Sequence, residues 1–280
     1  MSKTYPFLVS ITGADNAVNP QRLVELSEYF PFVEWALLHL PHKEGQPRNP
    51  TTSWRWKLAS LRIARASDCG PPVRTALHLC SEHVFTHILR GTESPTFLAE
   101  LSQYDRVQLN INARGTTFEP SEIVKLYDAL RWLDIPIIMQ AHEGTATGIR
   151  RFMTEVAQND EDSWWLRRLS LAAVEKGDIS ILLDRSKGRG VAPAVWPPPV
   201  SYSGRALHTG YAGGISPDNI EAVLDATQRA VESSGNPAHP YWLDMESGVR
   251  TDNRFDLTKV ERVLEAVAAR MATMPVAEPV

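Results

Sequence analysis

The sequence predicts an α/β fold, a single-domain (β/α)8 TIM barrel, and three observations lead to this prediction. Eight short apolar runs of strand type are separated by helical patterns or long loops, which is typical of βαβ units with a parallel sheet. The chain has 280 residues, 43% of them hydrophobic, enough to fill one barrel. Three strand-like runs near the end of the chain finish in a carboxylate, a glycine pair or Ser-Gly, as expected where barrel strands lead into functional loops.

The eight strands are expected in chain order at residues 7–11, 32–38, 74–79, 106–111, 136–140, 179–183, 207–211 and 241–245. Side chains alternate between the two faces of a strand. Outward residues must pack on helices, so the polar residues of these runs are expected to face the barrel axis. The residues concerned are Glu34, His78, Gln108, Asn110, Asp184 and Asp244.

Helical patterns fill the intervals, for example at residues 19–29, 53–66 and 121–133. The clearest pattern is the spacing of Ile220, Val223, Leu224, Thr227 and Val231. It follows Ser216-Pro217-Asp218, which predicts a helix start with Pro at an early position. A last helix is expected after Asp256, where Val260, Val263, Leu264 and Val267 recur at helical spacing.

Proline marks the irregular parts of the predicted barrel. Pro193, Pro197, Pro198 and Pro199 exclude a regular helix from residues 191–205. The barrel domain is expected to span residues 1–271. Residues 272–280, which contain two prolines and no periodicity, are expected to form a frayed C-terminal tail.

The composition limits the binding partners and the cellular compartment that we expect for this protein. The net charge of −4 is spread along the chain without a basic block, so neither nucleic acid nor an acidic membrane surface is an expected partner. No uncharged apolar stretch approaches the roughly 20 residues that span a bilayer, and the N-terminus has no signal-peptide core. Two cysteines are too few for a disulfide framework. We therefore expect a cytoplasmic location and no membrane partner; the sequence does not indicate the oligomeric state.

Glycines follow the last three predicted strands, where a barrel usually holds phosphate. The stretches are Ser186-Lys-Gly-Arg-Gly190, Tyr211-Ala-Gly-Gly214 and Leu243-Asp-Met-Glu-Ser-Gly248. Glycine lets backbone N–H groups close on an anion, and a following helix N-terminus adds its dipole. The predicted phosphate-binding residues are Gly188, Gly190, Gly213, Gly214, Ser247 and Gly248, and the expected ligand is a small phosphorylated or anionic molecule.

These motifs resemble phosphoribosylanthranilate isomerase, the barrel enzyme of tryptophan biosynthesis. The resemblance is carried by Leu182-Leu-Asp184, Gly188-Arg-Gly190 with Trp196, Ala212-Gly-Gly214 with Pro217-Asp-Asn219, Asp244 with Ser247-Gly-Val249, and Asp105-Arg-Val-Gln-Leu109. It implies an intramolecular isomerase without cofactor or metal, with Asp184 as the catalytic acid. It also implies substrate contacts from Arg48, Gln108, Asn110 and Asp244.

Two departures bear on activity. The family's first strand ends in a catalytic Cys-Gly, the base of its Amadori rearrangement, whereas this chain has Thr12-Gly13. A threonine hydroxyl cannot abstract a proton at neutral pH without a strong partner base. The family's fourth strand continues Gln-Leu-His-Gly, whereas this chain has Gln108-Leu-Asn-Ile111. We therefore expect a phosphosugar-binding barrel that is a poor isomerase or none.

Two other functions stay open at this point. One is a non-catalytic ligand-binding or regulatory paralogue, favoured by Thr12. The other is a metal-dependent hydrolase whose ligands would come from a set of residues, several of them at or near strand ends. The set is His39, His42, His78, Cys80, His83, His142 and His208 with Glu34, Asp184 or Asp244. No His-x-His or His-Glu-x-x-His spacing supports it.

The loop around Arg48 also has two interpretations. Arg48 with Trp54 and Trp56 could clamp an aromatic carboxylate, or the tryptophans could belong to a helix core. The second is favoured.

Overall fold

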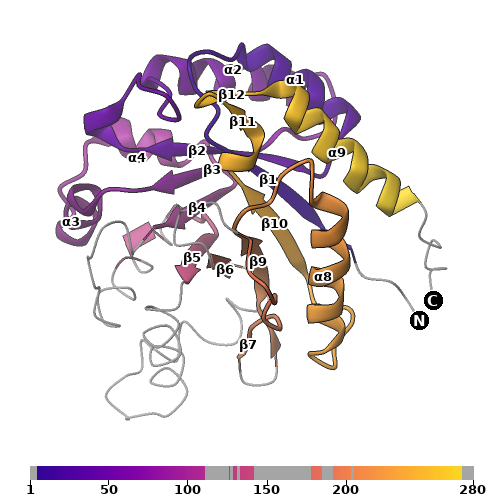
Figure 1. The fold of residues 1–280 in the computed structure, drawn as a ribbon. Helices are drawn as coiled ribbons and strands as arrows, with labels where there is room; N and C mark the ends of the chain where they lie inside the picture. Colours follow the sequence, from indigo (N-terminus) through magenta and orange to yellow (C-terminus); the bar gives the residue numbers. More distant parts are fainter. Residues whose placement is uncertain are drawn as a thin grey trace, which may run out of the picture.

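The computed structural model is a closed barrel of parallel strands in the order β1-β10-β9-β6-β5-β4-β3-β2 (Figure 1), which confirms the predicted (β/α)8 TIM barrel. The structure describes residues 5–110, 126, 129–130, 133–141, 178–184, 192–202 and 205–272. The barrel strands are β1 (Leu8–Thr12), β2 (Val33–His39), β3 (Arg74–Leu79), β4 (Arg106–Leu109), β5 (Ile137–Ala141), β6 (Ile179–Asp184), β9 (His208–Ala212) and β10 (Tyr241–Met245). Seven lie within one residue of their predicted ends, and β4 stops two residues early.

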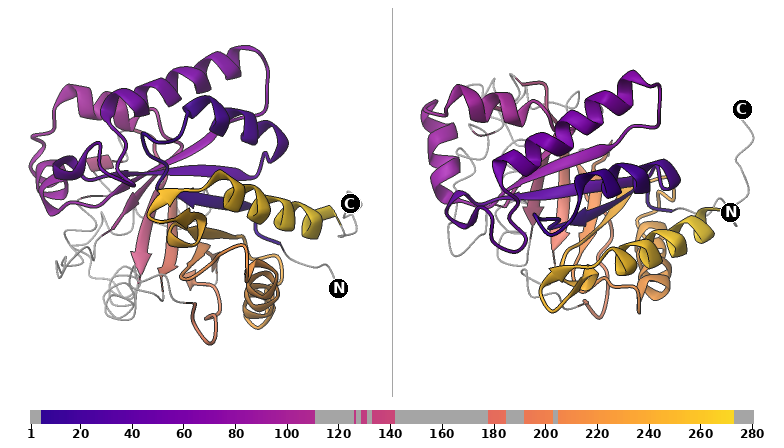
Figure 2. Two further views of the ribbon diagram at one scale, coloured as in Figure 1. Left: turned by 45° about the horizontal axis from the view of Figure 1, so that its top comes forward. Right: turned by 90° about the horizontal axis from the view of Figure 1, so that it is seen from above.

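Helices lie outside the ring of strands (Figures 1 and 2). The described ones are α1 (Pro20–Tyr29), α2 (Thr52–Ser67), α3 (Glu82–Arg90), α4 (Pro95–Leu101), α8 (Ile220–Glu232) and α9 (Leu257–Ala272), with the short 3₁₀ helices η1 (Pro41–Lys43) and η2 (Ser247–Val249). Side-chain oxygens cap the first two, because Asn19 accepts from the amide of Gln21 and Thr51 from that of Trp54. Helices α3 and α4 were not predicted. Most of the helix expected at 121–133 lies outside the described residues.

The start of α8 corrects one detail of the prediction. Pro217 lies in a turn rather than in the helix, which begins at Ile220 after Asn219. The Asn219 side chain closes this turn, since its Oδ1 accepts from the amide of Ser216 at 2.8 Å and its Nδ2 donates to the carbonyl of Gly214 at 2.8 Å. The turn therefore belongs to the loop that leaves β9.

Residues 192–202 contain no helix, as the prolines predicted; the short strands β7 (Ser201–Tyr202) and β8 (Arg205–Ala206) pair there instead. At the other end, α9 continues through Ala272, and residues 273–280 lie outside the described part. No helix in the described ranges is long and apolar enough to cross a membrane.

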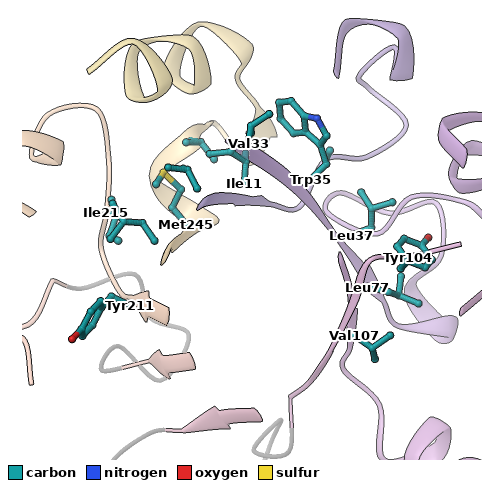
Figure 3. Close-up of a cluster of buried hydrophobic side chains, with 14 of the residues drawn as sticks. Ile11, Val33, Trp35, Leu37, Leu77, Tyr104, Val107, Tyr211, Ile215 and Met245 are labelled. Atoms are coloured by element: carbon teal, nitrogen blue, oxygen red, sulfur yellow. The ribbon is translucent and has the colours of Figure 1, made fainter. Parts of the chain in front are cut away.

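Strand alternation divides the core in two. Odd-numbered residues of the strands, such as Ile11, Val33, Trp35 and Leu37, pack outward in a large cluster under the helices (Figure 3). A much smaller apolar cluster fills the axis and consists of Leu8, Ile138, Leu182, Ala212 and Trp242. Only a few apolar residues occupy the axis, because most even-numbered positions of the strands carry polar side chains.

A buried ion pair occupies the barrel interior below the strand ends. Arg106 donates to both carboxylate oxygens of Glu34, at 2.6 and 2.8 Å, and its guanidinium carbon lies 4.6 Å from the centre of the Trp242 ring. Burial is the largest single influence and would raise the pKa of Glu34, but the Arg106 charge and the hydrogen bonds to the carboxylate together outweigh it and lower the pKa below its ordinary value. Glu34 therefore stays ionised inside the barrel.

Gly210 makes room for the axial tryptophan. A Cβ at this position would lie 2.3 Å from the Trp242 ring and 2.6 Å from Leu182 Cδ1. We expect Gly210→Ala to lower the free energy of unfolding by about 1–3 kcal/mol, the usual effect of overpacking a core. Denaturant unfolding measures it. Adding Trp242→Phe should restore part of the loss; a double variant less stable than the sum of both changes would contradict the steric explanation.

Candidate active site

A cavity of about 150 Å³ opens at the carboxyl ends of the strands, the face where barrel enzymes carry their chemistry. Its walls bring together most of the predicted site residues that the structure describes. They are Thr12, Gln108, Asn110, Asp184, Gly213, Gly214, Asp244, Ser247 and Gly248, joined by Leu38, His78, Gln140, Leu182, Ala212, Ile215, Met245 and Glu246. Gly188 and Gly190 lie outside the described residues.

The sheet register sets the two aspartates at one level of the barrel. Asp184 is paired with Ala212, and Ala212 with Asp244. The carboxylates therefore extend from β6 and β10 on either side of a small residue, and both are buried, with exposures of 5% and 7%. This places two acids on neighbouring walls of one cavity with space above Ala212 between them.

Thr12 and Asp244 are in direct contact in the cavity. The Thr12 hydroxyl donates to Asp244 Oδ1 at 2.7 Å, across residues 232 positions apart in the chain. Burial raises the pKa of Asp244 from 3.8 to about 7; the Thr12 hydrogen bond opposes the rise, and the nearby charges of Glu246, Glu34 and Asp184 add to it. Asp244 can therefore accept and return a proton near neutral pH.

Side-chain amides on β4 and β5 hold polar residues of the cavity wall in place. Gln140 donates to Asp184 Oδ2 at 2.9 Å, and Gln108 donates to Asn110 Oδ1 at 2.7 Å.

Burial lowers the pKa of His78 to about 4, and burial raises the pKa of the Cys80 thiol to about 12. At neutral pH His78 is therefore an uncharged imidazole and Cys80 a thiol, so Cys80 does not supply the missing thiolate.

Two glycine turns close the cavity above Asp244. Gly213 and Gly214 have φ values of +128° and +61°, conformations that favour glycine. Among the described residues, the amides of Gly213, Gly214 and Ile215 have no hydrogen-bond acceptor. Gly248 passes so close to this turn that a Cβ would lie 1.9 Å from the carbonyl oxygen of Ile215. The two loops thus form one packed unit beside the acids, and its amides have no acceptor in the part of the chain that the structure describes.

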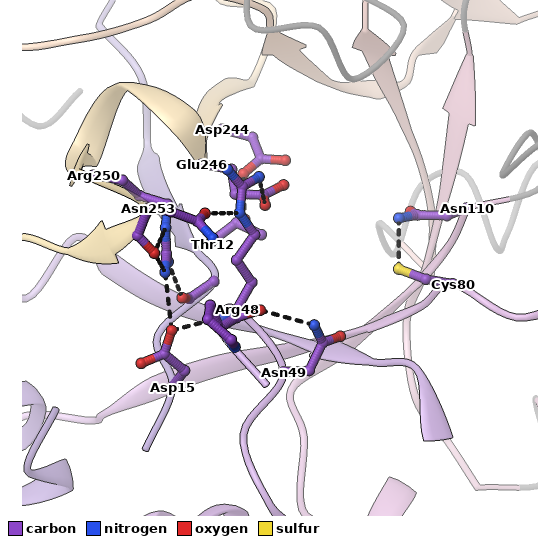
Figure 4. A network of polar contacts seen from close by, with 12 residues as sticks. Thr12, Asp15, Arg48, Asn49, Cys80, Asn110, Asp244, Glu246, Arg250 and Asn253 are labelled. Atoms are coloured by element: carbon purple, nitrogen blue, oxygen red, sulfur yellow. Dashed lines mark hydrogen bonds and ion pairs between the residues drawn. The ribbon is translucent and has the colours of Figure 1, made fainter. Parts of the chain in front are cut away.

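Arg48 lies at the rim and is tied to the cavity wall (Figure 4). Its Nη1 donates to Glu246 Oε1 at 2.6 Å and its Nε to Asn253 Oδ1 at 3.0 Å. Its backbone amide donates to Asp15, which also pairs with Arg250 at 2.9 Å in a buried salt bridge. The loops after β1, β2 and β10 are thereby joined, and Arg48 is positioned close to the cavity without lining it.

The remaining described residues that the sequence suggested for a ligand or metal site do not gather at the cavity. Trp54 is core, as favoured, and its Nε1 donates to the carbonyl of Val18 at 2.8 Å, whereas Trp56 is half-buried and does not belong to the buried core. Trp196 packs edge-on against Tyr211. Of the histidines proposed for metal binding, His142 lies outside the described residues. In the described part of the chain no three His, Cys, Asp or Glu side chains are grouped so that they could hold a metal ion.

Sequence reasoning did not single out Glu246, Asp15 or Arg250. Strand alternation places Glu246 on the face of Asp244, but it gives no indication of a role for that residue in the site. Asp15 and Arg250 are 235 residues apart. Their salt bridge follows from the closure of β1 on β10, which no local pattern indicates.

Together the fold and the cavity define a TIM-barrel protein with buried acids beside glycine turns. No family model matches the chain, and no curated protein matches its sequence. Among solved structures, N-(5'-phosphoribosyl)anthranilate isomerase from Pyrococcus furiosus is similar, at 14% identity over 94% of this chain and 99% of that chain, with a TM-score of 0.50.

A second similar structure is the sulfate complex of octameric ribulose-1,5-bisphosphate carboxylase/oxygenase from Pyrococcus horikoshii. It is 12% identical over 98% of this chain, which spans 59% of that longer one, with a TM-score of 0.52. At such low identities, both similarities show the TIM-barrel fold alone.

Proposed function

We propose that this barrel is an enzyme that moves protons on a small phosphorylated sugar or a related small anion, with Asp244 and Asp184 as its acid–base residues. The observation that carries the proposal is Asp244, a buried carboxyl whose pKa is raised to about 7 beside a glycine turn whose amides have no acceptor among the described residues. General acids and bases work best when their pKa lies near the operating pH. Strongly perturbed groups in clefts are candidates for catalysis.

In this proposal Asp244 is the base, and Thr12 only orients its carboxylate. Its hydroxyl, 2.7 Å from Oδ1, orients the carboxylate and leaves Oδ2 for the substrate. Asp184, kept in place by Gln140, lies on the neighbouring wall and exchanges a proton with a substrate oxygen. The base of the resembled isomerase would thus be replaced by a group from β10 rather than from β1.

The anion is assigned to the glycine turns. The amides of Gly213, Gly214 and Ile215 with Gly248 and the Ser247 hydroxyl would hold a phosphate group, and α8 begins shortly after this loop. Backbone amides at the start of a helix form a common phosphate site. Arg48, Gln108 and Asn110 would contact the remainder of the ligand. No cofactor, metal, nucleic acid or membrane is needed in this proposal, and the cytoplasmic location remains a prediction from the sequence.

Exchange of a substrate hydrogen with solvent deuterium tests the proposed chemistry, and it does not require the product to be known. We expect the protein to incorporate solvent deuterium into at least one member of a panel of sugar phosphates, followed by proton NMR in D₂O. Asp244→Asn should abolish exchange while phosphate-ligand binding persists. Gly248→Ala should remove binding, because its Cβ separates the two loops. The matched control is Asp218→Asn, which changes a carboxylate with an 82% exposed side chain.

Phosphoribosylanthranilate belongs in the panel because of the motif resemblance. We expect slow turnover or none, and Thr12→Cys is the informative partner variant. Ligand binding without exchange in every case would favour the non-catalytic paralogue. Exchange that survives Asp244→Asn would contradict the assigned base, and failure of all phosphorylated ligands to bind would contradict the anion site.

A further inference from the structure

A pair of histidines outside the barrel has the geometry of a metal chelate. His83 and His87 are four residues apart on α3, so they share one face of the helix. Their Nε2 atoms lie 3.1 Å apart and their ring centres 4.3 Å apart. Two imidazole nitrogens at about 2.0–2.1 Å from one tetrahedral metal ion are separated by roughly 3.3–3.4 Å. The observed 3.1 Å, which is also a hydrogen-bond distance, is close to the spacing of two ligands of one ion.

The second nitrogen of His87 supports this orientation. Its Nδ1 lies 2.8 Å from Thr92 Oγ1. When Nδ1–H donates to that oxygen, the Nε2 lone pair faces His83, as in metal-ligating histidines whose other ring nitrogen is held by an acceptor. The left-handed Gly91 at the end of α3 turns the chain so that Thr92 reaches back to the ring.

The space next to the pair allows further ligands to bind. His83, His87 and Thr92 line a pocket of about 420 Å³ between α2, α3 and α4. Two buried atoms on its walls, His39 Nδ1 and Glu93 Oε1, have no hydrogen-bond partner among the described residues. No third His, Cys, Asp or Glu completes a metal site in the described part of the chain, so water or a small anion must fill the remaining positions.

From this geometry we infer that His83 and His87 bind a divalent transition metal ion such as Zn²⁺ through their Nε2 atoms. Imidazole favours zinc, copper and nickel over calcium or magnesium. The site lies on the outer helices, away from the cavity that contains Asp184 and Asp244, and does not depend on the function proposed for that cavity.

Calorimetric titration of the whole protein with zinc chloride tests the inference. We expect one ion bound per chain at submillimolar or lower concentration and a raised melting temperature, since the ion binds the folded helix. His83→Gln and His87→Gln should each weaken binding at least tenfold. Thr92→Val should weaken it by about tenfold, because it frees the ring of His87. The control is His42→Gln, an exposed histidine on η1, which should leave affinity unchanged.

The histidine variants are expected to fold, because His83 is exposed, His87 is half-buried and Gln suits a helix. Circular dichroism verifies this. Absence of zinc binding, or binding that persists in both His83→Gln and His87→Gln, would overturn the assignment.

Discussion

Replacing Glu34 with Gln is expected to lower the free energy of unfolding by about 3–5 kcal/mol, the range seen when one partner of a buried ion pair is removed. Glu34 is 1% exposed and Arg106 donates to both of its carboxylate oxygens. The variant leaves the Arg106 cation inside the barrel with an amide in place of its counter-charge. Denaturant unfolding at neutral pH measures the loss as a lower midpoint.

Two further variants separate this explanation from general sensitivity of the barrel. Glu221→Gln breaks a surface ion pair with Arg270, in which the Glu221 side chain is 59% exposed. This change should lower the free energy of unfolding by less than about 1 kcal/mol. Replacing Glu34 and Arg106 together with Met should recover most of the loss, because no unpaired charge remains. If Glu34→Gln costs no more than Glu221→Gln, the pair is not desolvated as the structure indicates.

The strands and their inward faces could be predicted because their signals are local. Strand ends need only short apolar runs, and the inward direction of Asp184, Gln108 and Asn110 follows from alternation. Helix α4 also has local signals, since Ser94 caps the amide of Phe97 and Pro95 is its first residue. Those signals alone do not predict a helix, because its seven residues show too little periodicity.

The chemistry of the site could not be predicted in the same way, because it depends on groups far apart in the chain. Thr12 alone suggested a lost base, and Asp244 alone suggested a substrate contact. Only the pairing of β1 with β10 brings them within 2.7 Å. The raised pKa of Asp244 depends on burial and on charges from three other residues.

Replacing Asp244 with Asn is expected to stabilise the protein at pH 8 by about 3–4 kcal/mol, while at pH 4 the two proteins should be nearly equal. The folded state holds the Asp244 proton up to a pKa of about 7, whereas the unfolded chain releases it near 3.8. Unfolding therefore releases a proton between these values, and stability falls as pH rises from about 4 to 7, by about 1.4 kcal/mol per pH unit.

Asn stays neutral at all pH values and its Oδ1 can still accept from Thr12, so the variant escapes this loss. Unfolding in denaturant at pH 4 and pH 8 measures the difference, with the change of an exposed carboxylate, Asp218→Asn, as the control. An Asp244→Asn effect that is equal at both pH values would mean an ordinary pKa for Asp244. That result would remove the physical basis of the proposed acid–base role. The expected gain in the free energy of unfolding on Asp244→Asn therefore measures how much stability the unmodified protein loses by keeping a reactive carboxyl in a buried site.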